Sequence, residues 1–464
     1  MESNHREKYS RRRIVERMII LTGSIILLYL LISLYFVNHY FFNTMINGVN
    51  VSLKAHAEVD RYMNSFVKDY KLRIIERNGE IEEISGQSIK MKYNAQKGTS
   101  QINHMQSPIK WILSLFKHQK YNIKGLFVYD KAAYQKAIMD LNCIKRKQIE
   151  PSNADFQYTD GTYMLIKEDY GNKINYERLN KVIIQSMLKG KEMLDLEARL
   201  CYINPKYTLN AGKTLITRDL LNKYVSTKIT YRFGDTKEYL DGKVINQWLR
   251  VDQNLEIEIN KPAIKNYLKE LSNKYDTVGI TRSFKTTSGK IIEVKGGLYG
   301  WKINQAEEAK ALYQNILQGE IKEKEPIYLQ RALYRDEDEI GKTYVEISIT
   351  KQHLWFYKDG KLVVHGSVVT GNPNKGNSTV LGTYMLNYKQ KDATLKGPGY
   401  EAKVTYWMPF YGNMGIHDAS WRHSFGGEIY KRNGTHGCVN APFYLAKKIY
   451  ENIGEGIPII CYEE

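Results

Sequence analysis

Residues 415–422 read GIHDASWR, and residues 435–440 read THGCVN. In the second stretch His436 stands two residues before Cys438, a spacing that places both side chains on one face of a strand. A thiol is a strong nucleophile only as the thiolate, so it needs a base or a cation beside it. His417 is distant in sequence, but a base in a cysteine enzyme commonly reaches the thiol through the fold. The two stretches therefore predict a nucleophilic cysteine with two candidate bases.

The residue between that histidine and that cysteine is Gly437, which lets a substrate approach the backbone closely. The amides around this glycine can hold a developing oxyanion. The competing interpretation is a zinc site made of His417, His436 and Cys438, with His423. No regular ligand spacing is present, so we predict no metal and no cofactor.

Short alternating strands surround the two stretches. A hairpin with a turn at residues 358–361 and a last strand at residues 457–460 predict a mainly-β, sandwich-like domain over residues 341–464. One helix is predicted in it, Phe443–Asn452, because Ala441-Pro442 precedes an amphipathic run.

The spacing of these residues is similar to the signature of L,D-transpeptidase catalytic domains. A histidine, seventeen intervening residues and T-H-G-C-V-N make up that signature, and YWMPF at residues 406–410 and GCVNAP also resemble the family. The resemblance implies that Cys438 is the acyl-accepting nucleophile and His417 its base. It also implies that His436 is a supporting polar residue beside the thiol.

The resemblance further implies positions that contact substrate or orient the site. Asn440, Arg422, Trp421 and Tyr406 are the substrate-side candidates, although Arg422 can equally form a surface pair. In the family the backbone carbonyl after the first histidine orients that ring, so the side chain of Asp418 need not matter. One departure is visible: residues 379–382 read TVLG, where the family often has T-P-x-G.

The expected activity follows from the same resemblance. Such an enzyme acts on peptidoglycan stem peptides and forms a thioester at the bond between the third and fourth stem residues. The side-chain amine of a neighbouring stem then takes the acyl group, which gives a 3→3 cross-link. Two alternatives remain at this point: an L,D-carboxypeptidase, in which water takes the acyl group, and a non-catalytic wall-binding spacer.

An internal repeat precedes this domain. The sequence YGNKIN at residues 170–175 returns as YGWKIN at residues 299–304, and Gly190 returns as Gly319 at the same offset of 129 residues. A shared offset over such a distance indicates two copies of one α+β module. Each copy is predicted to contain a helix, a strand hairpin and a second helix. The helices are expected at residues 131–141, 175–188, 262–274 and 305–317, and the hairpins around Asp160-Gly161 and Ser288-Gly289.

The repeated region resembles the peptidoglycan-binding modules that precede many clostridial-type L,D-transpeptidases. Residues 273–304 and the GVNVS at residues 48–52 carry the resemblance. We place the first module at residues 41–205 and the second at residues 206–330. The resemblance implies contact with glycan strands, and a stalk that sets the height of the enzyme is the alternative.

The N-terminus predicts the compartment. Met18–Val37 is free of charge, and twenty helical residues span about 30 Å, the thickness of a bilayer core. Basic residues crowd before it, and the next Lys or Arg after it is Lys54. This asymmetry predicts a cytoplasmic tail at residues 1–17, a transmembrane helix at residues 18–40 and an extracytoplasmic remainder. A cleaved signal peptide is the competing interpretation.

The net charge is +18, with an isoelectric point near 9.3. Such a charge predicts attraction to an anionic partner. No zinc-finger spacing, single-strand RNA signature or recognition-helix pattern favours nucleic acid, so the anionic cell envelope is the expected partner. The oligomeric state is not predicted.

The chain has four cysteines, Cys143, Cys201, Cys438 and Cys461. An extracytoplasmic compartment permits a disulfide, and the first two are the natural pair because Cys438 is needed as a thiol. The alternative is that both are buried thiols. His365 and Cys461 are expected to be packing residues.

Overall fold

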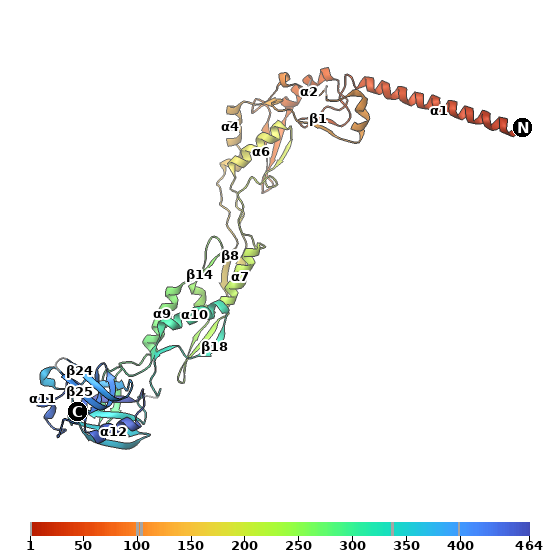
Figure 1. The fold of residues 1–464 in the computed structure, drawn as a ribbon. Helices are drawn as coiled ribbons and strands as arrows, with labels where there is room; N and C mark the ends of the chain where they lie inside the picture. Colours follow the sequence, from red (N-terminus) through yellow and green to blue (C-terminus); the bar gives the residue numbers. More distant parts are fainter. Residues whose placement is uncertain (1, 99–101, 103–104, 336–337, 398–399) are drawn as a thin grey trace. The chain divides into compact units, whose positions relative to one another are not determined.

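The computed structural model describes residues 2–98, 102, 105–335, 338–397 and 400–464. The chain divides into two compact units (Figure 1). Unit 1 contains residues 1–155 and 165–214, and unit 2 contains residues 156–164 and 215–464. The multidomain organisation expected from the sequence is confirmed.

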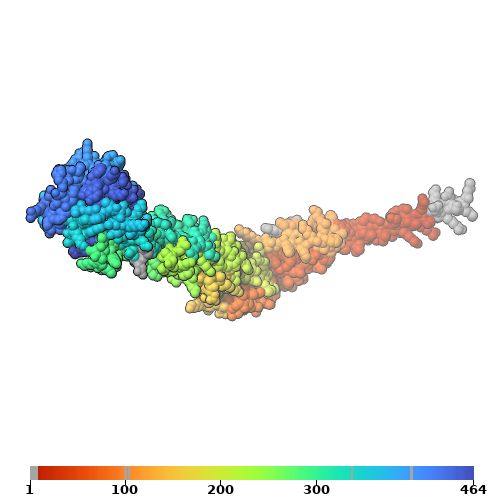
Figure 2. Space-filling view, turned by 90° about the horizontal axis from the view of Figure 1, so that it is seen from below, coloured from red at the N-terminus to blue at the C-terminus, as the bar shows by residue number. Residues whose placement is uncertain are grey.

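A long helix, α1 (Glu2–Tyr35), opens unit 1. Its stretch Tyr9–Tyr35 is long and apolar enough to cross a membrane, and 6% of its most apolar window is buried. In the view of Figure 2 no other segment covers the red part of α1. The helix ends short of the predicted boundary at residue 40, because Tyr40 is fully buried in the core of the first module.

The first module surrounds a three-stranded sheet in the order β10-β3-β4, in which β10 runs parallel to β3. Its core is formed by the apolar faces of the helices and the inner residues of the strands. The elements are α2 (His56–Asp69), β3 (Lys71–Ile75), β4 (Ile81–Ser85), α4 (Lys131–Met139), α6 (Tyr176–Leu188) and β10 (Met193–Asp195).

The second module repeats that order. Its sheet runs β12-β11-β18, with β18 parallel to β11. Its elements are α7 (Gly212–Val225), β11 (Lys228–Phe233), β12 (Thr236–Leu240), α9 (Lys261–Tyr275), α10 (Gln305–Gln318) and β18 (Ile321–Lys324). The four predicted helices are confirmed. The opening helix and hairpin of each copy were not predicted, because they lie upstream of the sequence match.

Each module also has a hairpin that packs outside its own sheet. In the first, β8 (Asp155–Thr159) and β9 (Thr162–Ile166) place Tyr163 in the core of the second module. In the second, β15 (Arg282–Lys285) and β16 (Ile291–Val294) place Phe284 against strand β28 (Pro458–Tyr462) of the C-terminal domain. The tip of the first hairpin, residues 156–164, is accordingly part of unit 2.

The C-terminal domain is mainly β, as predicted, and contains two sheets. The first has the order β22-β21-β20-β28-β23 and the second the order β24-β25-β26-β27. Helix α12 (Phe443–Asn452) begins and ends as the sequence predicts and contributes Leu445 and Ile449 to the core. The remaining strands are β20 (Tyr344–Ser348), β21 (His353–Lys358), β22 (Lys361–Ser367), β23 (Gly382–Met385), β24 (Gln390–Gly397), β25 (Tyr400–Tyr411), β26 (Met414–Asp418) and β27 (Val439–Ala441).

The predicted disulfide of the first module is absent. Cys143 and Cys201 are both free, buried thiols in the same hydrophobic core. Burial is the main reason why the pKa of each is raised, to about 11 for Cys201. The structure therefore agrees with the buried-thiol alternative.

Candidate active site

The candidate catalytic residues meet on two neighbouring strands. Strands β26 and β27 run parallel, with His417 opposite Asn440. Cys438 directly precedes β27 and lines the same cavity as His417 and Asn440. On the other side of β26, Trp407 of β25 lies opposite His417. The sheet register therefore brings the distant histidine and the cysteine to one surface.

The orientation of the His417 ring defines which nitrogen can accept a proton. The side chain is 3% exposed, and its Nδ1 lies 2.9 Å from the main-chain oxygen of Asp418. Because a carbonyl oxygen only accepts, Nδ1 is the protonated nitrogen and Nε2 keeps the free lone pair. Burial lowers the pKa of His417, although the Asp418 contact opposes this shift. The His417 ring can therefore accept a proton at Nε2.

The Cys438 thiol is also in a low-dielectric position. Its Sγ lies 3.4 Å from the main-chain oxygen of Asn413. Burial raises the pKa of the thiol, and a hydrogen bond from the backbone at Gly415 lowers it in part. Burial therefore disfavours the charged form of both Cys438 and His417.

Threonine hydroxyls hold the turn before the cysteine. Thr435 Oγ1 accepts from the Gly437 amide at 3.0 Å and donates to the Cys438 carbonyl at 2.6 Å. Thr379 Oγ1 donates to the Gly437 carbonyl at 2.7 Å and accepts from the Gly371 amide at 2.9 Å. Gly437 has φ +117°, and a Cβ there would lie 2.6 Å from Met414 Cε. Only glycine fits this backbone position.

A cavity of about 510 Å³ opens over these residues. Half of the residues that line this cavity are candidates from the sequence. The other half come from the β24–β25 hairpin and from the turn before Cys438. The lining residues are Leu395, Glu401, Ala402, Lys403, His417, Trp421, Arg422, Gly434, Thr435, His436, Cys438 and Asn440.

Arg422 is a polar side chain of this cavity that can form a further hydrogen bond. Its buried Nε has no hydrogen-bond partner within the part of the chain that the structure describes. A buried guanidinium nitrogen without a partner is costly unless a ligand satisfies it. Beside it Trp421 is 47% exposed, with its ring 6.0 Å from the ring of His417. This corner of the cavity combines a cation with an aromatic surface.

Comparison with known proteins agrees with this geometry. Residues 342–461 match the family model described as "L,D-transpeptidase catalytic domain". A mutant of the Enterococcus faecium L,D-transpeptidase is 31% identical, over 54% of this chain and 100% of its own, with a TM-score of 0.43. The chain belongs to the L,D-transpeptidase family.

Other matches lie within the same family. The isolated catalytic domain of the Enterococcus faecium enzyme is 37% identical over 26% of this chain and 96% of its own, with a TM-score of 0.24. An L,D-transpeptidase from Stackebrandtia nassauensis is 28% identical over 26% of this chain and 55% of its own, at a TM-score of 0.23. Residues 83–195 and 207–323 match the model described as "Putative peptidoglycan binding domain". The comparison with curated proteins found no match.

One predicted substrate contact of this L,D-transpeptidase is wrong. Tyr406 packs in the domain core, with its ring 5.5 Å from Phe443 and 5.1 Å from Tyr450. Its neighbour Trp407 faces the site instead, because successive side chains of a strand alternate between the two faces. The Trp407 ring lies 5.9 Å from the His417 ring. All five residues of YWMPF are buried, so the sequence alone does not show which of them face the site.

Other residues that the sequence selected line the cavity. His436, Trp421, Arg422 and Asn440 line the cavity with Cys438. Thr379 and Trp407 are residues that prediction missed. The sequence noted Thr379 only as the start of TVLG, in which Val380 stands where the family often has proline. No group of three or more metal-ligating His, Cys, Asp or Glu side chains occurs among the residues described here.

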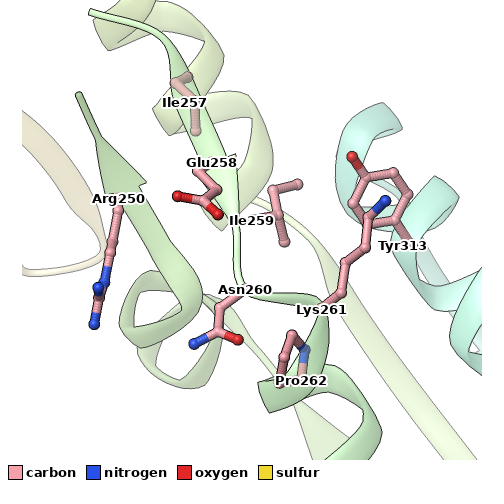
Figure 3. A pocket seen from close by; sticks show the side chains of 8 residues that line it. All are labelled: Arg250, Ile257, Glu258, Ile259, Asn260, Lys261, Pro262 and Tyr313. Carbon is pink, nitrogen blue, oxygen red and sulfur yellow. The ribbon is translucent and has the colours of Figure 1, made fainter. Parts of the chain in front are cut away.

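A second cavity, of about 590 Å³, lies in the second module (Figure 3). It is lined by Arg250 and Glu258 from two paired strands, by Lys261 at the start of α9, and by Tyr313 of α10. The Lys261 ammonium lies 5.0 Å from the centre of the Tyr313 ring. Charged hydrogen-bonding groups and an aromatic ring therefore share one concave surface.

Proposed function

We propose that the chain forms 3→3 cross-links in peptidoglycan through a thioester on Cys438, with His417 as the base. The observation that carries this proposal is the cavity beside the paired strands β26 and β27, which both His417 of β26 and Cys438, just before β27, line. The Nδ1 contact with Asp418 leaves Nε2 of His417 as the proton acceptor.

The proposed reaction has two halves. Nε2 of His417 takes the thiol proton while Sγ of Cys438 attacks the carbonyl between the third and fourth stem residues. The C–N bond then breaks, and the terminal D-residue leaves with that proton on its amine. In the second half His417 takes a proton from the acceptor amine, which attacks the thioester and releases the thiol. We assign the developing oxyanion to the Cys438 amide, because the Gly437 amide donates to Thr435.

Arg422 is the proposed contact for a substrate carboxylate. The donor stem ends in a carboxylate before its last residue leaves, and a guanidinium binds such a group with two hydrogen bonds. The unsatisfied Nε supports this role. Arg422→Lys is expected to raise KM with a smaller effect on kcat, because the charge remains and the paired geometry is lost.

One experiment separates the proposal from its alternatives. The purified chain is incubated with tetrapeptide stems, and the products are identified by mass spectrometry. A cross-linked dimer supports the transpeptidase, a shortened stem supports the carboxypeptidase, and no reaction supports a spacer. His417→Ala should lower acylation by about a hundredfold or more. A near-normal rate in this variant would transfer the base role to His436.

Peptidoglycan is the partner that both family matches support. We propose that the second-module cavity is one place of contact, because Tyr313 offers a ring for stacking on sugars beside three charged side chains (Figure 3). Tyr313→Ala should weaken co-sedimentation with purified sacculi. The matched control is Tyr239→Ala, which removes an exposed tyrosine of β12 in the same module. Equal binding by both variants would exclude this cavity.

We further propose that α1 anchors the chain, with its N-terminus in the cytoplasm and residues 41–205, 206–330 and 341–464 outside. The basic residues before the apolar run support this orientation. Packing of Phe36 with Phe41 and Trp111 supports retention of the helix, since cleavage would open that cluster. Protease added to intact protoplasts should remove nearly the whole chain. Protection of the C-terminal domain would reverse the orientation.

A further inference from the structure

A short segment of unit 1 has an unusual surface. Residues 105–116 contain the 3-10 helix η2 (Pro108–Leu115), and Phe116 directly after it is 88% exposed. Large apolar side chains are otherwise seldom exposed in such a dense group on a soluble domain. The exposed side chains are Met105, Ile109, Ile112, Leu113, Leu115 and Phe116.

The segment packs against the end of α1. Trp111 is buried between Tyr29 and Phe36 of that helix, with ring centres 5.7 and 6.0 Å away. The Tyr29 hydroxyl donates to the main-chain oxygen of Ile109. One side of η2 is therefore attached to α1, while its apolar side chains point away from the protein core.

The position along α1 corresponds to the edge of a bilayer. Tyr29 precedes the end of α1 at Tyr35 by six residues, about 9 Å of helix. Interfacial helices insert about 5–10 Å below the membrane surface. Trp and Tyr are enriched at this depth, and Trp111 and Tyr29 are the residues that join the two elements.

The charges near η2 fit the same position. Lys110, Lys117 and Lys120 lie within or directly after it, and the stretch from Gln106 to Lys120 contains no Asp or Glu. Lysine side chains at an interface extend their ammonium groups to the headgroups and are attracted by anionic lipids. At a membrane interface the apolar side chains contact lipid tails and the lysines contact lipid headgroups. In water, neither group would gain from lying beside the other.

We propose that residues 105–116 insert into the outer leaflet beside α1 and form a second membrane contact of the first module. The proposal rests on the anchoring role of α1 and is independent of the catalytic assignment. Its consequence is that the first module lies against the lipid surface, because a spanning helix and an interfacial segment restrict it at two places.

The test uses the full chain with Cys438→Ser, in which the three remaining cysteines are buried and do not react with a dye. A fluorophore is attached at Phe116→Cys, and the protein is reconstituted in phosphatidylglycerol and phosphatidylethanolamine vesicles containing spin-labelled lipid. Leu27→Cys on α1 is the lipid-exposed reference, and Ile81→Cys on β4 is the water-exposed reference in the same unit. Unfolding curves that match the Cys438→Ser parent show that the labelled chains are folded.

We expect the probe at residue 116 to be quenched several-fold more than the probe at residue 81, and most strongly by labels near the headgroup. Quenching at residue 27 but not at residue 116 overturns the inference and leaves the anchor intact. Quenching at neither overturns the anchor as well. A probe at residue 116 that is shielded from water but not quenched by lipid lies against a second copy of the chain, which also overturns the inference.

Discussion

Nδ1 of His417 lies 2.9 Å from the main-chain oxygen of Asp418, the next residue along β26. The same aspartate accepts a hydrogen bond from the Tyr406 amide through its side chain, at 2.7 Å. Asp418 thus contacts the His417 ring with its backbone and the neighbouring strand with its carboxylate. The position of the imidazole depends on how firmly β25 and β26 are joined at this point.

The first prediction tests that junction. Asp418→Ala leaves the Tyr406 amide buried without its acceptor, which should cost about 1–3 kcal/mol of unfolding free energy. Asp418→Asn retains an acceptor oxygen and should lose less. Denaturant unfolding measures both variants. Equal stability of Asp418→Ala and the parent would show that the carboxylate contributes nothing to the strand junction.

The second prediction concerns the nucleophile. Cys438→Ala should abolish acyl-enzyme formation, seen as loss of the mass-shifted protein, while the variant still folds. Cys461→Ala is the matched control, since it removes a buried thiol from β28 in the same domain. It should retain turnover with a modest loss of stability. Substantial cross-linking by the Cys438 variant would exclude this residue as nucleophile.

The third prediction is a pH dependence. His417 must be neutral to accept the thiol proton, and burial holds its pKa below the ordinary 6.5. The acidic limb of kcat/KM should therefore have its midpoint below pH 6.5. The same shift makes burial of the neutral ring a stabilising contribution that is present above pH 6.5 and is lost as the pH falls below it. A limb centred above 6.5 would contradict the assignment.

The fourth prediction concerns Thr379, a positioning residue. Thr379→Val keeps the side-chain shape but removes the hydroxyl shared by Gly371 and Gly437. We expect kcat to fall by about tenfold with little change in KM, because the turn that carries Cys438 loses its support. Thr379→Ser retains the hydroxyl and should recover most of the rate. Equal kinetics for the Val and Ser variants would remove this role.

The fifth prediction concerns the link between the second module and the catalytic domain. Arg282 of β15 and Glu339 form a buried ion pair at 2.6 Å, with side chains 1% and 6% exposed. Arg282→Met leaves a buried carboxylate without its partner and should cost about 3–5 kcal/mol. The double variant with Glu339→Leu should be less destabilised, because neither charge then remains. If the unfolding free energy of Arg282→Met equals that of the parent, the ion pair does not stabilise the position of the β15–β16 hairpin.

Local features of this protein could be predicted from the sequence alone. Helices such as Phe443–Asn452 and the hairpin turn at Asp160-Gly161 are confirmed, because capping residues, apolar periodicity and glycine act over a few neighbours. The sequence also selected His417, Cys438 and His436 as candidates, since a close family spacing marks them, and the three line one cavity. The opening helix and hairpin of each module were missed because the repeat match begins after them.

The tertiary structure alone decided which of these residues act together. The choice between Tyr406 and Trp407 depends on which face of β25 meets α12, and the role of Thr379 depends on a contact with Gly437 far along the chain. Cys143 and Cys201 share one core without a bond, which their spacing could not reveal. The sequence determined the membrane-length helix, the repeat and the reactive motif, because local chemistry encodes them. Strand register and core packing determined which side chains line the cavity. Both depend on contacts between segments that are distant in the sequence.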